Sequence, residues 1–227
     1  DLQSEQMSEL TGLIKVAQDI EWPIIPVLAR MEYIGIELNT EYLKDMSSEV
    51  DDIISDLEQE IYGHADFEFN ISSPAQLADV LFIKLNLPKE GIKRGKTGYS
   101  TAASELDKLR GAHPIIDLIT KYREVTKLKN TYIDTLPSQV DEHSRLHTTY
   151  AMTVAQTGRL SSNDPNLQNI PVRTDLGKRI RTAFVAGSEH MLVSADYSQF
   201  ELRIAAYLCK DENLIKQFNE DVDVHTT

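Results

Sequence analysis

Residues 191–208 read MLVSADYSQFELRIAAYL, and the hydrophobic period changes within this stretch. Its first five residues are apolar or small, as in a short buried strand, and Asp196 follows them directly. After that, Phe200, Ile204 and Leu208 recur at helical spacing. The stretch therefore predicts a strand followed by a helix, as in an α+β fold. Asp196 at this junction is either a helix N-cap, the commoner role of a lone aspartate, or a ligand at the mouth of a metal site.

A second carboxylate, Glu201, lies five positions after Asp196. On one helix, five positions rotate by about 140°, so the two side chains would point to different faces. We therefore expect Glu201 in a pocket wall and not on the same metal ion as Asp196.

The composition is that of a soluble globular protein, because 41% of the 227 residues are hydrophobic and can form a core. No run approaches the roughly 20 apolar residues of a membrane span, and the acidic first ten residues lack the regions of a signal peptide. We expect a cytoplasmic protein with no membrane contact. The single cysteine, Cys209, excludes an internal disulfide and a cysteine-based zinc cluster, and its apolar neighbours predict a packed thiol.

The formal net charge of −13 is unevenly distributed. Residues 1–70 hold 3 basic and 17 acidic residues, residues 71–150 hold 12 and 9, and residues 151–227 hold 8 and 10. Phosphate contacts need Lys and Arg. A polyanion could therefore be held by the later two thirds, with the acidic first third turned to solvent or toward other protein.

The first 145 residues carry the pattern of long helices. An apolar helical pattern over 13–34 is broken by WPIIP, and GIELNTEY after it predicts a short extended piece that ends in a cap, Asn39 or Thr40. An apolar stripe then predicts one projecting helix of about 20 residues. The stripe consists of Leu43, Met46, Val50, Ile53, Leu57 and Ile61.

Two further helices have clear start signals. Ser73 as N-cap, Pro74 at the first helical position and Gln76 three residues after the cap predict the first of them. The second begins at or just after Pro114 and is stopped by Pro137. Its apolar face consists of Ile115, Ile116, Ile119, Tyr122, Leu128, Tyr132 and Leu136.

Between these helices, residues 89–106 read KEGIKRGKTGYSTAASEL, a basic turn with three glycines that leads into a helix. Ser100 or Thr101 would cap that helix, and the amide groups at its N-terminus, with the flanking lysines, would suit a phosphate backbone. An exposed, solvated loop is the alternative that this stretch alone favours. The residues that would contact DNA are Lys93, Arg94, Lys96, Thr97, Ser100 and Thr101.

The pattern changes after residue 145. Residues 145–155 alternate and are rich in Thr, Tyr and Val, and residues 190–196 form a short apolar run, so both predict strands. Between them, TGRLSSNDPNLQNIP at 157–171 is rich in amides and hydroxyls, which can donate to the minor-groove acceptors of every base pair. A loop packed on its own turns is the alternative. We expect a helical first part and an α+β second part, with the boundary near 145.

Four stretches together resemble the DNA polymerase I family (family A). DYSQFELRIAAYL is similar to the first palm motif of that family, TGRLSSNDPNLQNIP to the segment before it, and KTGYST and IPVLARMEYIGI to its thumb and thumb entry. The resemblance runs from about residue 20 to 227. It implies a helical thumb with long projecting helices, followed by part of an antiparallel-sheet palm. The implied division is a linker from a missing upstream domain at 1–24, the thumb with the palm entry at 25–145, and the N-terminal half of the palm at 146–227.

The resemblance also implies a role for the carboxylate. In family A, the aspartate of DYS helps to hold two Mg²⁺ ions, which act on the primer 3′-hydroxyl and on the phosphates of the incoming nucleotide. Asp196 matches this aspartate, and the carbonyl of Tyr197 would complete a metal's coordination. Glu201 would disfavour a ribose 2′-hydroxyl, in agreement with its separate helix face. Gln199 would lie near the terminal base pair, and His225 near the phosphates of the nucleotide.

The same likeness implies DNA contacts in the polar segment. Arg159 would reach the minor groove at the primer end. Near the primer-template junction, DNA would be touched by Asn166, Gln168 and Asn169. The implied reaction is the template-directed addition of deoxynucleotides to a primer, with primer-template DNA and deoxynucleoside triphosphates as partners.

The chain departs from the family pattern because it stops at Thr227. In the family, the fingers helix and the HDE-type motif with the second metal carboxylate follow that point, so we expect a C-terminal fingers and palm polypeptide as a partner. Two other functions stay open. One is a primer-template binding module without catalysis, and the other is a metal nuclease using Asp196, which lacks a second carboxylate on the same strand. The family implies a cytoplasmic, nucleoid location, while an organellar or phage origin stays open.

Overall fold

The computed structural model describes residues 10–95 and 98–220, and the chain divides into two compact units between Glu189 and His190. The helices and helical turns of the first unit are α2 (Thr11–Val16), η1 (Ala17–Glu21), α3 (Trp22–Ile34), α4 (Thr40–Ala65), α5 (Pro74–Asp79), η2 (Val80–Lys84), α6 (Ala103–Leu106), η3 (Asp107–Leu109), α7 (Ile115–Leu128), η4 (Lys129–Ile133), η5 (Leu136–Ser138) and α8 (Asp175–Thr182). Its strands are β1 (Ile36–Leu38), β2 (Arg94–Gly95), β3 (Gly98–Tyr99), β4 (Arg145–Leu146), β5 (Thr149–Ala151), β6 (Ser161–Asn163) and β7 (Phe184–Val185). The second unit carries α9 (Phe200–Cys209) and α10 (Glu212–Asn219). The chain is thus mainly helical with small antiparallel sheets, as the predicted α+β class requires.

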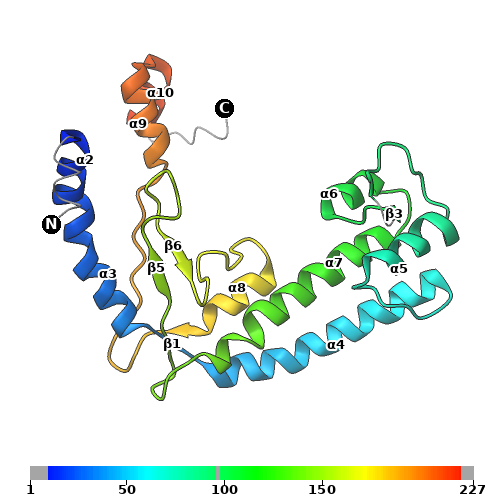
Figure 1. Ribbon diagram of the computed structural model, residues 1–227. Helices are drawn as coiled ribbons and strands as arrows, with labels where there is room; N and C mark the ends of the chain where they lie inside the picture. Colours follow the sequence, from blue (N-terminus) through cyan, green and yellow to red (C-terminus); the bar gives the residue numbers. More distant parts are fainter. Residues whose placement is uncertain (1–9, 96–97, 221–227) are drawn as a thin grey trace. The chain divides into compact units, whose positions relative to one another are not determined.

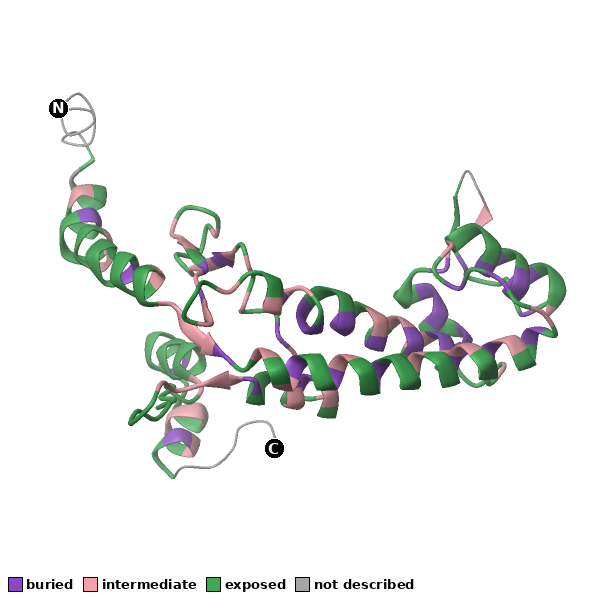
Figure 2. Cartoon of the chain, turned by 90° about the horizontal axis from the view of Figure 1, so that it is seen from below, coloured by how far each residue is buried: buried purple, intermediate pink, exposed green. Residues whose placement is uncertain are grey.

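Helices α4 and α7 lie side by side and form the long axis of the first unit (Figures 1 and 2). The start of α4 is capped as predicted, because the side chain of Asn39 accepts the N–H of Tyr42 at 3.0 Å. The predicted apolar stripe is buried except for Ile53, which is 37% exposed, while Ile54 packs against the core in its place. Both residues fit the helical spacing, so the position of the facing helix decides between them.

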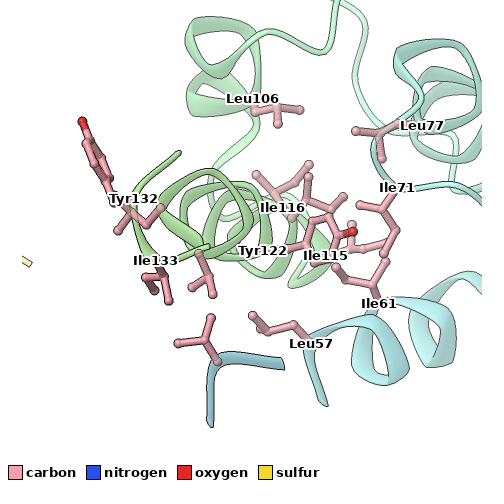
Figure 3. Packing of buried hydrophobic residues seen from close by; sticks show 14 of the residues in the cluster. Leu57, Ile61, Ile71, Leu77, Leu106, Ile115, Ile116, Tyr122, Tyr132 and Ile133 are labelled. Atoms are coloured by element: carbon pink, nitrogen blue, oxygen red, sulfur yellow. The ribbon is translucent and has the colours of Figure 1, made fainter. Parts of the chain in front are cut away.

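The core lies between these two helices and continues into the end where α5, β3 and α6 gather (Figures 1 and 3). Every predicted apolar position of α7 and its extension is buried, and Ile115, Ile116 and Ile119 are completely so. Burial of one such side chain contributes about 1.5–3 kcal/mol, so this cluster dominates the stability of the unit. We call the end that holds α5, β2, β3 and α6 the tip.

The start of α5 follows the predicted cap with one difference. Ser73 accepts the N–H of Gln76 at 3.5 Å, and Pro74 is the first helical residue. The side chain of Gln76 does not return to Ser73 but accepts the N–H of Asn70 at 2.8 Å. The cap therefore also fixes the chain segment that enters the tip.

Prolines do not end the helices where the sequence predicts. The pattern over 13–34 is not broken by WPIIP, because α2, the π turn η1 and α3 follow one another directly. Pro23 lies just after the π turn η1, and Pro26 lies inside α3. Nor does Pro137 stop the helix after Pro114, since that helix ends at Ile133 and Pro137 lies in the separate turn η5.

A buried lysine holds η4 against α4. Lys129 is 8% exposed, and its Nζ donates to Asp134 at 2.9 Å and to the hydroxyl of Ser47 at 2.7 Å. Asp51 lies 3.3 Å away. Burial alone would lower the pKa of Lys129, but the bonds to Asp134 and Asp51 outweigh it, so the pKa is raised and the ammonium stays charged.

A three-stranded antiparallel sheet, in the order β4-β1-β7, joins segments on both sides of residue 145. Glu37, in the central strand β1, lies opposite Arg145 of β4 on one side and Val185 of β7 on the other. Gly35 precedes the sheet with φ of +62°, and a Cβ there would lie 2.4 Å from the carbonyl of Leu146, so only glycine fits. The predicted strand over 145–155 is thus two short strands, β4 and β5, and β5 pairs with β6.

A polar clasp fastens β4 to the end of α3. Arg145 donates through Nε to the carbonyl of Ile34 at 2.6 Å and through a terminal nitrogen to the carbonyl of Gly35 at 3.0 Å. The ring of His147 lies between the carbonyl of Glu32 at 2.7 Å and the carboxylate of Asp141 at 3.1 Å. The Glu32 carbonyl and then the Asp141 carboxylate raise the pKa of His147.

Many apolar side chains of the second unit are exposed to solvent. The predicted strand at 190–196 is wrong, because no described strand pairs with these residues, and unpaired backbone groups do not hold a strand. Val193 is 82% exposed, and Cys209 is also exposed and not the packed thiol that was predicted. Within the unit, Asp211 caps α10, and the guanidinium of Arg203 lies 4.8 Å from the ring centre of Phe218.

None of the helices in the described part of the chain combines the length and the apolar content needed to cross a membrane.

Candidate nucleic-acid interface and metal carboxylate

The basic turn forms a hairpin at the tip, in which β2 pairs with β3. Lys93 and Arg94 are exposed, and the guanidinium of Arg94 lies 5.5 Å from the ring centre of Tyr99. Lys96 and Thr97 lie outside the described residues. Two exposed cations, one of them beside an aromatic ring, can make phosphate contacts without reading sequence.

The end of this turn differs from the prediction. Neither Ser100 nor Thr101 caps a helix, because α6 starts after Ala102 and has only four residues. Such a short helix does not provide the expected phosphate site at its N-terminus. Thr101 is 4% exposed, and Arg123 donates to both its carbonyl and its hydroxyl. The hydroxyl of Ser100 accepts the N–H of Ala102 at 3.3 Å. Through these hydrogen bonds, both residues thus stabilise the end of the basic turn.

The polar segment at 157–171 contains β6 and a loop that is partly held by its own side chains. The carboxamide of Gln168 accepts the N–H of Ser162 at 3.3 Å and donates to the carbonyl of Leu160 at 3.1 Å. Ser162 is buried, with its hydroxyl 2.6 Å from that of Thr148. The packed-loop interpretation therefore fits Gln168. Arg159, on the other hand, is exposed.

A cleft of about 630 Å³ separates this loop from α7, η4 and η5. Two of the predicted DNA contacts, Asn166 and Asn169, line its loop side. The helical side adds Lys127, Thr131 and Gln139, which the sequence analysis missed. For Lys127 and Thr131, the available signal was their place among the polar positions that alternate with the apolar stripe of the predicted helix. Gln139 lies beyond the predicted end of that helix at Pro137, so the pattern gave no signal for it.

The second unit carries the candidate catalytic carboxylate. Helix α9 begins at Phe200, and its N-cap is Gln199, in a left-handed conformation with φ of +54° and no side-chain cap bond. Asp196 therefore lies ahead of the helix, exposed, and is not an N-cap. Contrary to the prediction, Asp196 and Glu201 do not lie on different faces of one helix, because only Glu201 is helical.

The oxygen atoms at this position fit a hard cation only in part. A carboxylate from Asp196 and the carbonyl of Tyr197 are the ligand types that Mg²⁺ accepts, and both residues are exposed. Across residues 10–95 and 98–220, no three His, Cys, Asp or Glu side chains gather in a way that could hold a metal ion. Any metal here needs further ligands, and His225 lies outside the described residues.

This combination of a helical tip with exposed cations, a polar cleft and an exposed aspartate before a helix defines a candidate nucleic-acid enzyme. Comparison with known proteins makes the class specific. The family model for DNA polymerase family A matches residues 40–227. The chain belongs to DNA polymerase family A.

Named relatives agree with this assignment. The chain is 53% identical over 224 residues to the thermostable DNA polymerase I of Thermus thermophilus, which is 98% of this chain and 27% of that protein. It is 47% identical, over 98% of this chain and 25% of the relative, to DNA polymerase I of Streptococcus pneumoniae. Among solved structures, the POL domain of Pol1 from M. smegmatis, in complex with DNA primer-template and dNTP, matches with a TM-score of 0.85 and 40% identity. That match covers 97% of this chain and 39% of that one. The chain therefore spans about a quarter of the length of these curated relatives.

Proposed function

We propose that this chain forms the thumb and the N-terminal half of the palm of a DNA-directed DNA polymerase. The enzyme adds deoxynucleotides to a primer 3′-hydroxyl, directed by a template, and releases pyrophosphate. The observation that carries the proposal is the 53% identity to a DNA polymerase I over 98% of the chain, in a stretch that includes the exposed Asp196. In this scheme, residues 1–24 link to an upstream domain, residues 25–145 form the thumb with the palm entry, and residues 146–227 belong to the palm.

Asp196 is proposed as a metal ligand, together with the carbonyl of Tyr197. Two Mg²⁺ ions, when bound, would lower the pKa of the primer hydroxyl and stabilise charge on the nucleotide phosphates. The exposure of Asp196 ahead of α9 supports this role, since its carboxylate is accessible to an ion and to substrate. A second carboxylate from a C-terminal polypeptide would complete the site.

Three further side chains are proposed to contact the nucleotide. Glu201, in the first turn of α9, would form the wall under the sugar and reject a ribose 2′-hydroxyl. Gln199 would lie beside the terminal base pair. His225 would approach the phosphates of the incoming deoxynucleoside triphosphate.

Primer-template DNA would contact the first unit at two places. At the tip, Lys93 and Arg94 would meet the phosphate backbone, together with Lys96 and Thr97. Exposure of the first two supports this, whereas the burial of Thr101 limits it and Ser100 to holding the turn.

At the cleft, Asn166 and Asn169 would donate to minor-groove acceptors, with Lys127 opposite them. Arg159 would reach the minor groove at the primer end. Gln168 would act by keeping the loop in shape, in view of its two bonds within that loop.

A C-terminal polypeptide with the fingers and the rest of the palm is the proposed protein partner. It would cover exposed side chains such as Val193 and Leu208. The relatives are bacterial enzymes, so the proposed location is the bacterial cytoplasm, at the nucleoid.

The alternative function is a primer-template binding module without catalysis. It is favoured because no three His, Cys, Asp or Glu side chains gather into a metal site in the described part of the chain. A primer-extension assay separates the two. The chain alone with Mg²⁺, primer-template and deoxynucleotides should give no extension, and addition of the C-terminal polypeptide of a close relative should restore it. If the combined proteins bind DNA but never extend the primer, the binding module is the better account.

A further inference from the structure

The basic turn is attached to a buried carboxylate. Glu105 in α6 is 2% exposed, and its Oε2 accepts two hydrogen bonds. One comes from the backbone N–H of Lys93 at 3.0 Å and the other from Nζ of Lys108 at 2.7 Å. Lys108 also donates to the carbonyl of Gly91 at 2.8 Å. One carboxylate and one ammonium thus hold the segment 91–93 that leads into the hairpin.

Further contacts hold the described backbone of the hairpin while the side chains of Lys93 and Arg94 stay exposed. The carbonyl of Lys93 accepts the N–H of Ser100 at 2.8 Å, so both backbone groups of Lys93 are bonded while its side chain is exposed. Ile92 is buried in the core, and the ring of Tyr99 lies 5.0 Å from that of Phe82. The backbone of the turn is therefore fixed on both sides.

A buried carboxylate destabilises a fold unless its charge and its lone pairs are satisfied. In Glu105, the bond from Lys108 and then the bond from the Lys93 amide favour the ionised form and lower the pKa of the carboxyl. An apolar side chain would fill the same position without this requirement. The carboxylate therefore provides something that burial alone does not, which is an acceptor for the N–H next to the exposed cations.

We infer that Glu105 is a positioning residue that holds Lys93 and Arg94 in place for contact with the phosphate backbone. The inference rests on the proposed DNA-binding role of the turn. The expected direction of the effect on DNA affinity is unusual, because removal of an acidic residue near a phosphate-binding surface ordinarily strengthens binding. Here removal of the carboxylate weakens binding, since the cations lose their fixed position.

The test uses matched variants of the full chain and a primer-template duplex, with fluorescence anisotropy at several salt concentrations. Glu105→Gln removes the charge but keeps an oxygen that can accept the Lys93 N–H, and Glu105→Leu keeps the volume but removes the acceptor. Glu90→Gln, at an exposed position of the same turn, is the control for loss of one negative charge. Lys93→Ala/Arg94→Ala is the reference for loss of the cations. Hydrogen exchange of the Lys93 amide reports the contact without DNA.

The double variant should bind roughly tenfold more weakly at moderate salt and lose about two units of salt slope. Glu105→Leu should lose at least about threefold in affinity and part of that slope, with Glu105→Gln between it and the unchanged protein. Glu90→Gln should bind equally or up to about twofold more tightly. In the background of the double variant, Glu105→Leu should cause no further loss, because the residues act as one unit. The Lys93 amide should exchange faster in Glu105→Leu.

Two results overturn the inference. One is tighter binding by both Glu105 variants, as in Glu90→Gln, while the double variant binds weakly, because that would make Glu105 an ordinary repulsive charge. The other is unchanged exchange of the Lys93 amide in Glu105→Leu. A double variant with an unchanged salt slope would instead contradict the DNA-binding role of the turn, and the exchange measurement would still decide whether Glu105 holds it. Should Glu105→Leu unfold the tip, the affinity and exchange of Glu105→Gln decide in the same way.

Discussion

The helix pair α4–α7 and the stretch 191–208 have equally clear apolar patterns, but only the first is covered. Ile116 and Ile119 in α7 are completely buried, whereas Val193 and Leu208 are 82% and 71% exposed. Apolar side chains stabilise a protein only through the water-accessible area that they lose. The comparison teaches that a hydrophobic period predicts the type of an element, while the partner that covers it must come from elsewhere in the fold.

The largest expected effect of a substitution in the second region is on catalysis. In the whole polymerase, Asp196→Ala should lower turnover by several orders of magnitude while duplex binding stays within about tenfold, because a metal ligand acts chiefly on the transition state. Single-turnover primer extension and anisotropy measure the two quantities. Glu201→Ala is the matched control, since it should keep measurable extension but lose discrimination between ribo- and deoxynucleotides. Equal losses of turnover and DNA binding in Asp196→Ala would exclude the metal role.

Stability should differ between matched leucines of the two regions. Leu81 in the tip is completely buried, and Leu208 in α9 is mostly exposed. Leu81→Ala should lower the free energy of unfolding by about 2–5 kcal/mol, because it leaves a cavity, and Leu208→Ala by less than about 0.5 kcal/mol. Urea denaturation of this chain followed by circular dichroism measures both. Similar losses in the two variants would mean that α9 is covered in solution.

The smallest effect should come from the clasp between α3 and β4. Both ring nitrogens of His147 face acceptors, the carbonyl of Glu32 and the carboxylate of Asp141, so the charged form is favoured and the pKa of His147 is raised. The backbone N–H of Arg145 and then His147 lower the pKa of Asp141 to about 2.

A raised histidine pKa gives stability that is complete below the ordinary value of about 6.5 and is lost as pH rises through the folded value. A lowered aspartate pKa gives stability above about 3.9 that is lost as pH falls toward 2. Because both side chains are about one third exposed, solvent screens the pair and its contribution is small. His147→Gln should therefore flatten the decline of the free energy of unfolding as pH rises above about 6.5, the ordinary pKa of histidine, with the exposed His143→Gln as control. An unchanged slope in His147→Gln would contradict the assignment.

Sequence patterns predicted the features that depend only on residues close by in the sequence. The cap at Asn39, the start at Ser73 and the apolar face of α7 depend on neighbours within a few residues, and all three are present. The choice between Ile53 and Ile54 was not predictable, because it depends on where α7 lies. Strand pairing at 190–196 failed for the same reason, since a strand needs a partner that its own residues do not specify.

The sequence predicted which residue types form the candidate site better than it predicted their exposure and contacts. The spacing of the basic turn indicated Lys93 and Arg94, and both are exposed. It also indicated Thr101, which is buried, because the sequence does not show that Arg123 reaches it from α7. Glu105 was missed, since a glutamate inside a helical pattern normally indicates a solvated face.

The central claim is that the core of the first unit is buried within this chain, whereas the apolar residues at 191–193 are uncovered. Hydrogen–deuterium exchange of this chain tests it directly. Amides of α7 around Ile116 and Ile119 should be protected by at least about a thousandfold, as expected for the most stable core, while those of residues 191–195 should exchange at nearly the rate of an unfolded peptide. With the C-terminal polypeptide bound, residues 191–195 should become protected. Strong protection of residues 191–195 in this chain alone would contradict the account.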